Sequence, residues 1–130
     1  MKKKQITVVI PTLGKKNINN LLKKITNNNL VKEVLISIPN LNNKKIHNFN
    51  NKKIKIVNSR FKHQVKQRII CYKKIKTKYT LLLDDDVNFN KNFIMNLLKI
   101  KIEKGNNSVI GPIYYNYKNF EKIYKIDLNF

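Results

Sequence analysis

The sequence is poor in cysteine, glycine and proline, and it contains no tryptophan. Its single cysteine, Cys71, cannot form a disulfide within the chain and does not indicate a zinc site, so we expect a reduced, cytoplasmic compartment. Long apolar runs are also lacking: Ile6 to Ile10 is too short for a signal-peptide core, and no other run reaches the length of a membrane span. Any membrane contact is therefore expected to be peripheral and electrostatic, at the inner face of the membrane.

Acidic residues are scarce as well, with seven against 28 basic residues and a formal net charge of +21. Such a charge favours anionic partners, namely nucleic acid, an acidic membrane surface or a phosphorylated substrate. The lysines are spread along the chain, however, and Lys, Asn and Ile abound as in the proteins of a very AT-rich genome. We therefore attribute most lysines to composition, and the charge alone identifies no partner.

Hydrophobic residues make up 42% of the chain, which is enough for a core, and they alternate between strand-like runs and helix-like spacing. Strands are predicted at residues 6–10, 34–38, 54–57, 79–83 and 108–113, and helices around residues 21–25 and at 65–75 and 92–102. This alternation predicts an α/β fold, with a mainly parallel sheet flanked by helices on both faces and right-handed crossovers. We expect a single domain over residues 1–130, with a core at about 6–113 and a tail at 114–130 that the pattern does not define.

An acidic triplet, Asp84-Asp85-Asp86, follows the apolar run Tyr79 to Leu83. Three consecutive carboxylates repel one another unless a cation lies among them. The triplet is predicted at the carboxyl end of a strand, where ligands bind in open α/β sheets, and strand alternation aims Asp84 and Asp86 to one side and Asp85 to the other. Mg²⁺ or Mn²⁺ suits such oxygen ligands together with substrate phosphates; a solvated acidic turn, or local pairing with nearby lysines, is the alternative.

Three segments match one family pattern. They are Val8 to Thr12, which ends in Ile-Pro-Thr; His63 to Arg68; and Tyr79 to Val87, a strand that runs into an Asp-X-Asp motif. Val109 to Pro112 is a fourth, weaker match. On these segments and their spacing, the chain resembles the N-terminal nucleotide-sugar-binding portion of glycosyltransferase family 2, which has the Rossmann-like GT-A fold. The matches cover roughly residues 6 to 113.

The resemblance implies a site for the nucleotide-sugar donor. By this resemblance, Pro11 and Thr12 border the nucleoside, and Gln67 and Arg68 face the nucleotide or its diphosphate. In the family an acidic residue usually follows the second strand and contacts the base. Here Asn40 stands after that strand, and its side-chain carbonyl is the hydrogen-bonding group expected in that place.

The resemblance also implies roles for the triplet. Asp86 is the first choice for direct metal coordination, with Asp84 as its companion, while Asp84 and Asp85 contact the ribose or metal-bound water. The implied cofactor is Mn²⁺ or Mg²⁺, which would bridge the two phosphates of a nucleotide-diphospho-sugar and act as a Lewis acid. The implied reaction transfers the sugar to a hydroxyl of a glycan or lipid-linked acceptor, with inversion at the anomeric carbon.

The general base of such a transfer is not identified. The acidic residues after the triplet are Glu103, Glu121 and Asp127, and none of them matches the acceptor region of the family. The chain is also shorter than a whole GT-A domain, so we expect a truncated form, a fragment, or a minimal member that takes acceptor elements from a partner, and its activity alone is left open.

Two other functions stay open. The charge suggests a basic nucleic-acid-binding module, but no recognition helix or aromatic–basic motif supports it, so no specific nucleic acid is predicted. An α/β nucleotidyltransferase also uses carboxylates and a divalent metal, but such enzymes usually carry a glycine-rich basic loop after the first strand. Here that loop holds Gly14, Lys15 and Lys16, which either bring N–H groups and charge near a phosphate or form a plain turn.

Overall fold

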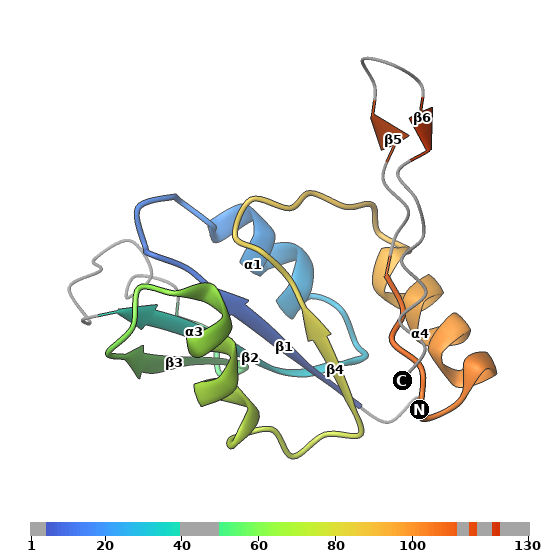
Figure 1. Ribbon diagram of the computed structural model, residues 1–130, viewed down its shortest axis with the longest axis horizontal. Helices are drawn as coiled ribbons and strands as arrows, with labels where there is room; N and C mark the ends of the chain where they lie inside the picture. The colour runs from blue at the N-terminus through green and yellow to red at the C-terminus, as the bar shows by residue number, and fades with distance from the viewer. Residues whose placement is uncertain (1–4, 40–49, 112–114, 117–120, 123–130) are drawn as a thin grey trace. The chain divides into compact units, whose positions relative to one another are not determined.

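The computed structural model describes residues 5–39, 50–111, 115–116 and 121–122 (Figure 1). The chain divides into two compact units, Met1–Phe89 and Asn90–Phe130. Asn40, the residue expected to meet the nucleoside base, lies outside the described residues.

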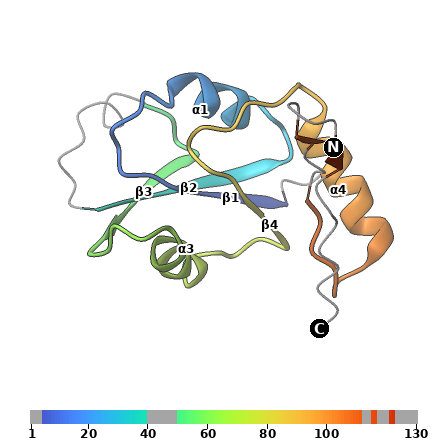
Figure 2. The ribbon, with the colours of Figure 1, turned by 45° about the horizontal axis from the view of Figure 1, so that its top comes forward.

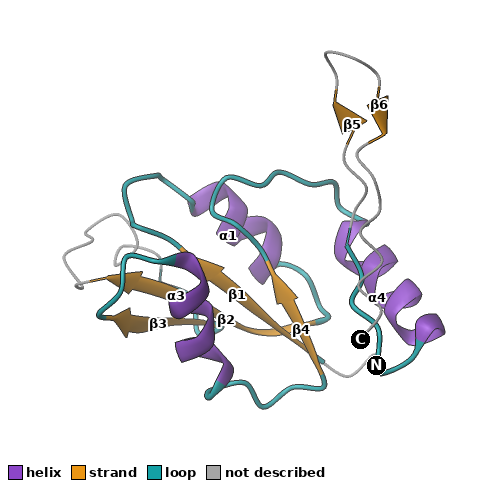
Figure 3. Cartoon of the chain, viewed as in Figure 1, coloured by secondary structure: helices purple, strands orange, loops and turns teal. Residues whose placement is uncertain are grey.

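The first unit is built on a four-stranded parallel sheet, as the alternating pattern predicts. Its strands are β1 (Ile6–Pro11), β2 (Val31–Pro39), β3 (Ile54–Ser59) and β4 (Tyr79–Leu82). They lie in the order β3-β2-β1-β4, and Figure 3 shows their arrows pointing the same general way. The prediction of an α/β fold with a parallel sheet is confirmed.

The two central strands are buried because helices cover both faces of the sheet. Every residue of β1 is buried, which explains why its sequence is a continuous apolar, β-branched run rather than an alternating one. Helix α1 (Asn19–Thr26) lies on one face and helix α3 (Gln64–Tyr72) on the other, as Figure 2 shows. The layers predicted from the sequence are therefore present.

The two helices use their side chains differently. Helix α1 buries its predicted apolar residues Leu21, Leu22 and Ile25. Helix α3 instead buries Gln67 and Cys71, and Cys71 packs in a core cluster with Val9, Leu35 and Val57. Of the apolar residues that predict α3, Val65, Ile69 and Tyr72 are exposed, whereas Ile70 is partly buried and packs against this cluster. The spacing thus predicts the helix correctly but only part of the face that it turns inward.

The second unit contains α4 (Phe93–Lys104) and a short antiparallel pair, β5 (Tyr115–Asn116) and β6 (Glu121–Lys122). Helix α4 ends at Lys104 and is followed by Gly105, whose φ of 80° lies in the left-handed region that favours glycine. None of the described helices combines the length and apolarity needed to cross a membrane.

The strand predicted at residues 108–113 is wrong over its described part, residues 108–111, which form neither strand nor helix. Lys101 Nζ donates hydrogen bonds to the carbonyl oxygens of Gly105 at 2.8 Å and Ser108 at 2.6 Å, so this segment folds back on the end of α4. Val109 is 98% exposed. A β-branched run becomes a strand only where a neighbouring strand pairs with it, and residues 108–111 pair with none of the described strands.

Candidate functional site at the ends of β1 and β4

The site lies beside β1, where the order in which the chain adds strands to the sheet reverses. From β1 the chain builds outward through β2 and β3, and it then returns to add β4 on the other side of β1. In open α/β sheets, ligands bind outside the carboxyl ends of the strands that flank such a point. Thr12 directly follows β1, and the triplet follows β4 after Leu83. The topology therefore brings two segments about 70 residues apart to one edge of the sheet.

Thr12 connects these two segments through its hydroxyl group. Its Oγ1 donates a 2.6 Å hydrogen bond to Asp85 Oδ2 and accepts one of 2.9 Å from the N–H of Gly14. Its own N–H donates to the carbonyl of Ser37 at the end of β2. Gly14 has a φ of 70°, a conformation that a residue with a β-carbon rarely adopts. The loop after β1 is thus held in a fixed turn against the aspartates.

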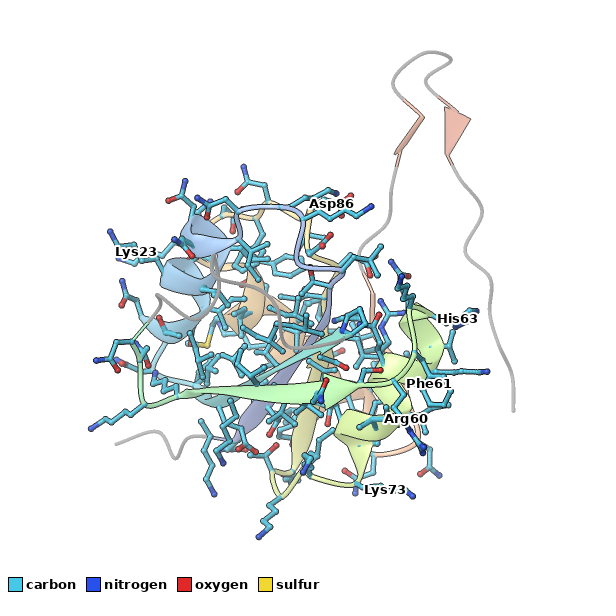
Figure 4. All side chains as sticks on the ribbon, turned by 90° about the vertical axis from the view of Figure 1, so that its left-hand side faces the viewer. Lys23, Arg60, Phe61, His63, Lys73 and Asp86 are labelled. Atoms are coloured by element: carbon cyan, nitrogen blue, oxygen red, sulfur yellow. The ribbon has the colours of Figure 1, made fainter. Side chains whose placement is uncertain are left out.

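Lys16 lies between two of the three carboxylates. Its Nζ is 3.6 Å from Asp85 Oδ1 and 3.4 Å from Asp86 Oδ2. The hydrogen bond to Asp86 and the negative charge of Asp85 raise the pKa of Lys16 above its ordinary value. The side chains of Lys16 and Asp86 are 56% and 64% exposed, so these ion pairs are weak and another cation can replace the ammonium. Figure 4 shows Asp86 beside the loop that follows β1.

The alternation expected for the triplet is not observed. Strand β4 ends at Leu82, and Asp85 and Asp86 form a turn, so the strand rule no longer applies to them. Asp85 and Asp86 share Lys16, while Asp84 accepts a hydrogen bond from Arg68 Nη2 on α3. The carboxylates of Asp85 and Asp86 therefore share the Lys16 ammonium, whereas alternation had predicted that Asp84 and Asp86 lie on the same side.

Arg68 retains hydrogen-bonding capacity beyond its contact with Asp84. Its Nε atom is buried and makes no hydrogen bond to any residue that the structure describes. A guanidinium carries five N–H donors and suits phosphate oxygens. Arg68 can thus hold Asp84 in place and still donate to an anionic ligand.

Gln67 is the neighbouring residue on α3, and it points into the sheet. It is buried, and its Nε2 donates to the carbonyl oxygens of Thr12 at 3.0 Å and Ser37 at 2.9 Å. Gln67 therefore joins the carboxyl ends of β1 and β2 and positions Thr12. Direct contact of Gln67 with a nucleotide, which the resemblance implies, stays a prediction.

The donor atoms at this edge of the sheet suit a hard divalent cation. Asp85 and Asp86 offer two carboxylates that already lie around one ammonium group. Mg²⁺ is commonly held by one or two carboxylates together with substrate phosphates, and Mn²⁺ suits the same oxygens. No group of three His, Cys, Asp or Glu side chains is arranged to hold a metal among residues 5–39, 50–111 and the two short strands of the tail. The fit is thus to a metal whose remaining ligands come from a phosphate ligand or water.

The other residues singled out in the sequence are placed as follows. Pro11 is the last residue of β1 and lies opposite Ser37 in the parallel register. Glu103 is an exposed residue of α4, Glu121 begins β6, and Asp127 lies outside the described residues. Lys16 belongs to the loop expected either to bring charge near a phosphate or to form a plain turn. Its contacts with Asp85 and Asp86 agree with the alternative that lysines pair with the triplet, but the sequence did not identify Lys16 as the partner, because no local pattern links residues 70 positions apart.

A comparison with protein families matches residues 6–111 to the glycosyl transferase family 64 domain. The matched range includes all four parallel strands, Arg68 and the acidic triplet. No curated protein matches the chain. The match supports a glycosyltransferase but does not support the narrower assignment to family 2. Carboxylates at a strand end reflect the demands of a metal and a diphosphate, so the motif alone does not separate one family from another.

Proposed function

The chain belongs to the glycosyl transferase family 64, and we propose that it transfers a sugar from a nucleotide-diphosphate donor to an acceptor hydroxyl with the help of a divalent metal. One observation carries this proposal: Thr12, Asp85 and Asp86 meet at the carboxyl ends of β1 and β4, with the ammonium group of Lys16 between the two carboxylates. The family membership supplies the class of reaction, and the geometry supports the choice of residues.

The metal would be held by Asp86 and Asp85. Both carboxylates reach the position of the Lys16 ammonium, whereas Asp84 is engaged by Arg68. Asp84 as a direct ligand stays a prediction that the variants below test. When bound, Mn²⁺ or Mg²⁺ supplies Lewis-acid stabilisation of the negative charge that develops on the departing diphosphate.

The residues around the aspartates would bind the rest of the donor. The exposed ammonium of Lys16, which contacts Asp85 and Asp86 here, would lie close enough to the aspartates to bind the diphosphate as well. The buried Nε–H of Arg68 provides a second donor for the same phosphates. Pro11 and Thr12 would border the nucleoside, because they lie at the end of β1 directly beside the triplet.

The acceptor would be a glycan or a lipid-linked sugar. Inversion at the anomeric carbon requires a general base, and the first unit offers no spare carboxylate for it. Its acidic residues are Glu33 and the triplet, and Glu33 is already bound to Thr7 and Lys55. The expectation of inversion came from the resemblance to family 2, so proton NMR of the product anomer decides between inversion and retention.

Calorimetric titration with UDP- and GDP-sugars, with and without Mn²⁺, tests the proposal. We expect the wild-type chain to bind a donor only with the metal, and Asp86→Asn and Asp85→Asn to weaken that binding by at least about tenfold, since a lost charge-assisted ligand costs about 1.5–3 kcal/mol. Asp84→Asn should have a smaller effect. Glu103→Gln on α4 is the matched control and should bind as the wild type does.

Two results would contradict the proposal. One is donor binding that does not depend on the metal in a folded sample. The other is unchanged affinity in both Asp85→Asn and Asp86→Asn. Thermal unfolding of each variant separates a lost ligand from a lost fold, and we expect little change for Asp86→Asn because Asp86 is largely exposed.

A further inference from the structure

The outer face of α3 carries large apolar side chains. Val65, Ile69 and Tyr72 are 53%, 49% and 45% exposed, and their spacing places them on one stripe of the helix. Phe61, just before the helix, is exposed as well. These four residues are called the α3 outer face below.

This exposure is unusual for a helix that packs on a sheet. Such a helix normally turns its aliphatic residues inward and its polar residues to water. Helix α3 does the reverse in part, because it buries Gln67 and exposes Val65 and Ile69. Since Gln67 is bound to two strand-end carbonyls, the helix cannot rotate to bury the stripe without losing both hydrogen bonds.

The α3 outer face is bordered by positive charge. The exposed lysines around it are Lys62, Lys66, Lys73, Lys74 and Lys76. The whole segment from residue 34 to residue 83 contains 13 Lys and Arg residues and no Asp or Glu. Lys66 Nζ lies 4.8 Å from the ring centre of Phe61, so charge and apolar surface are in direct contact. Figure 4 shows Arg60, Phe61, His63 and Lys73 beside α3.

We propose that the α3 outer face docks on the surface of a bilayer containing anionic phospholipid. A helix with lysines beside an apolar stripe lies in the plane of such an interface, where its apolar residues enter the headgroup region and its lysines meet lipid phosphates. A second copy of this chain is a poor occupant, because each copy carries a net charge of +21 and this face holds none of the acidic residues. Nucleic acid would satisfy the lysines but would leave Val65 and Ile69 without apolar contacts.

The docking goes beyond the proposed transfer and does not depend on it. Helix α3 also carries Arg68, which contacts Asp84 at the candidate site. A bilayer bound to the outer side of the helix would therefore lie one helix away from that site.

Sedimentation with phospholipid vesicles tests the proposal on the full chain. We expect binding to vesicles of equal parts phosphatidylcholine and phosphatidylglycerol, and none to phosphatidylcholine alone. The variant Val65→Ser/Ile69→Ser should bind the anionic vesicles at least about tenfold more weakly, since it removes two partly exposed aliphatic groups that the lipid would bury. The matched control Ile100→Ser/Ile102→Ser, at exposed positions of α4, should bind within about twofold of the wild type.

A second readout locates the contact. The chain contains no tryptophan, so Tyr72→Trp introduces a single reporter on the α3 outer face. Its fluorescence should shift to the blue with anionic vesicles, whereas that of Ile102→Trp should not. The proposal is overturned if the chain binds no anionic vesicle, if Val65→Ser/Ile69→Ser binds as tightly as the wild type, or if the Tyr72→Trp emission stays unchanged on bound vesicles.

Discussion

Gln67 is a single buried side chain on which the position of Thr12 depends. Its amide donates to the carbonyls of Thr12 and Ser37, so its removal takes one donor from each; the Ser37 carbonyl still accepts from the N–H of Thr12. We expect Gln67→Leu to lower the free energy of unfolding by about 1–3 kcal/mol, the range for a buried group left unpaired. Urea unfolding measures this change. Gln64→Leu, at an exposed position of the same helix, is the control, and equal losses in the two variants would contradict the role assigned to Gln67.

Glu33 is a buried acid at the start of β2. It accepts hydrogen bonds from Thr7 Oγ1 at 3.0 Å and from Lys55 Nζ at 2.7 Å. Burial alone raises the pKa of Glu33, but the hydrogen bonds from Lys55 and Thr7 and the nearby positive charge outweigh it, and the pKa lies below its ordinary value. The ionised form of Glu33 is therefore the form that the fold stabilises.

This lowered pKa predicts an acid-dependent loss of stability. An acid with a depressed pKa contributes stability that is fully present above its unfolded pKa of about 4.3 and is lost as the pH falls through its folded pKa. We expect Glu33→Gln to be less stable than the wild type by about 1 kcal/mol at pH 7, because the exposed Lys55 is screened by solvent. The difference should shrink below about pH 4. Urea unfolding from pH 7 to pH 3 measures it, and a constant difference would contradict the assignment.

At the scale of elements, α3 covers the core cluster around Cys71. Cys71 is fully buried against Val9, Leu35 and Val57, and burial raises the pKa of its thiol. The thiolate is the reactive form, so a thiol reagent should reach Cys71 only when α3 leaves the sheet.

Thiol labelling therefore measures how often α3 opens. We expect Cys71 to react at least about a thousandfold more slowly than an exposed cysteine, and the rate to rise with urea. A cysteine placed on the outer side of the same helix, Ile69→Cys combined with Cys71→Ala, is the control and should react at once. Equal labelling rates at the two positions in the absence of urea would show that α3 is not docked on the sheet.

The elements that the sequence predicts best are those whose pattern follows from burial alone. β1 and β2 lie in the middle of a sheet covered on both faces, so they are largely apolar runs, and their parallel direction follows from the alternation with helices. The inward face of α3 could not be predicted, because it is set by two carbonyls at the ends of other strands. The strand predicted at residues 108–113 depended on a pairing partner that its apolar run does not specify.

The candidate site likewise has one feature that the local sequence predicts and one that it does not. The position of the triplet at a strand end follows from the local sequence and was predicted correctly. The contacts of Asp85 and Asp86 do not follow from the local sequence, because they depend on Thr12 and Lys16, which the topology brings to them across more than 65 residues of chain. The choice of Asp84 and Asp86 as metal ligands stays a prediction. The direction of a side chain just after a strand is thus set by tertiary contacts, even where the strand itself can be predicted from the local sequence.

At the scale of the whole molecule, repulsion among positive charges opposes folding. The chain has 28 basic residues and seven acidic ones, and the ion pairs of exposed side chains in its described part, such as those of Lys16, are weak. Salt weakens both repulsion and attraction, and at about 0.1 M it screens exposed charges more than about 10 Å apart. Because basic residues greatly outnumber acidic ones, salt should weaken the repulsion between like charges more than it weakens the attraction between opposite charges.

We therefore expect sodium chloride to stabilise this protein. Raising it from a few millimolar to about 0.3 M should increase the melting temperature by about 3–8 °C, corresponding to roughly 1–2 kcal/mol. The triple variant Lys23→Gln/Lys73→Gln/Lys99→Gln, at exposed positions on three different helices or their ends, should respond less, because it begins with less repulsion. Differential scanning calorimetry measures both chains. A melting temperature that falls with salt would mean that the ion pairs of Lys16 and Lys55 outweigh the repulsion, and the lysines would then contribute to the fold rather than oppose it.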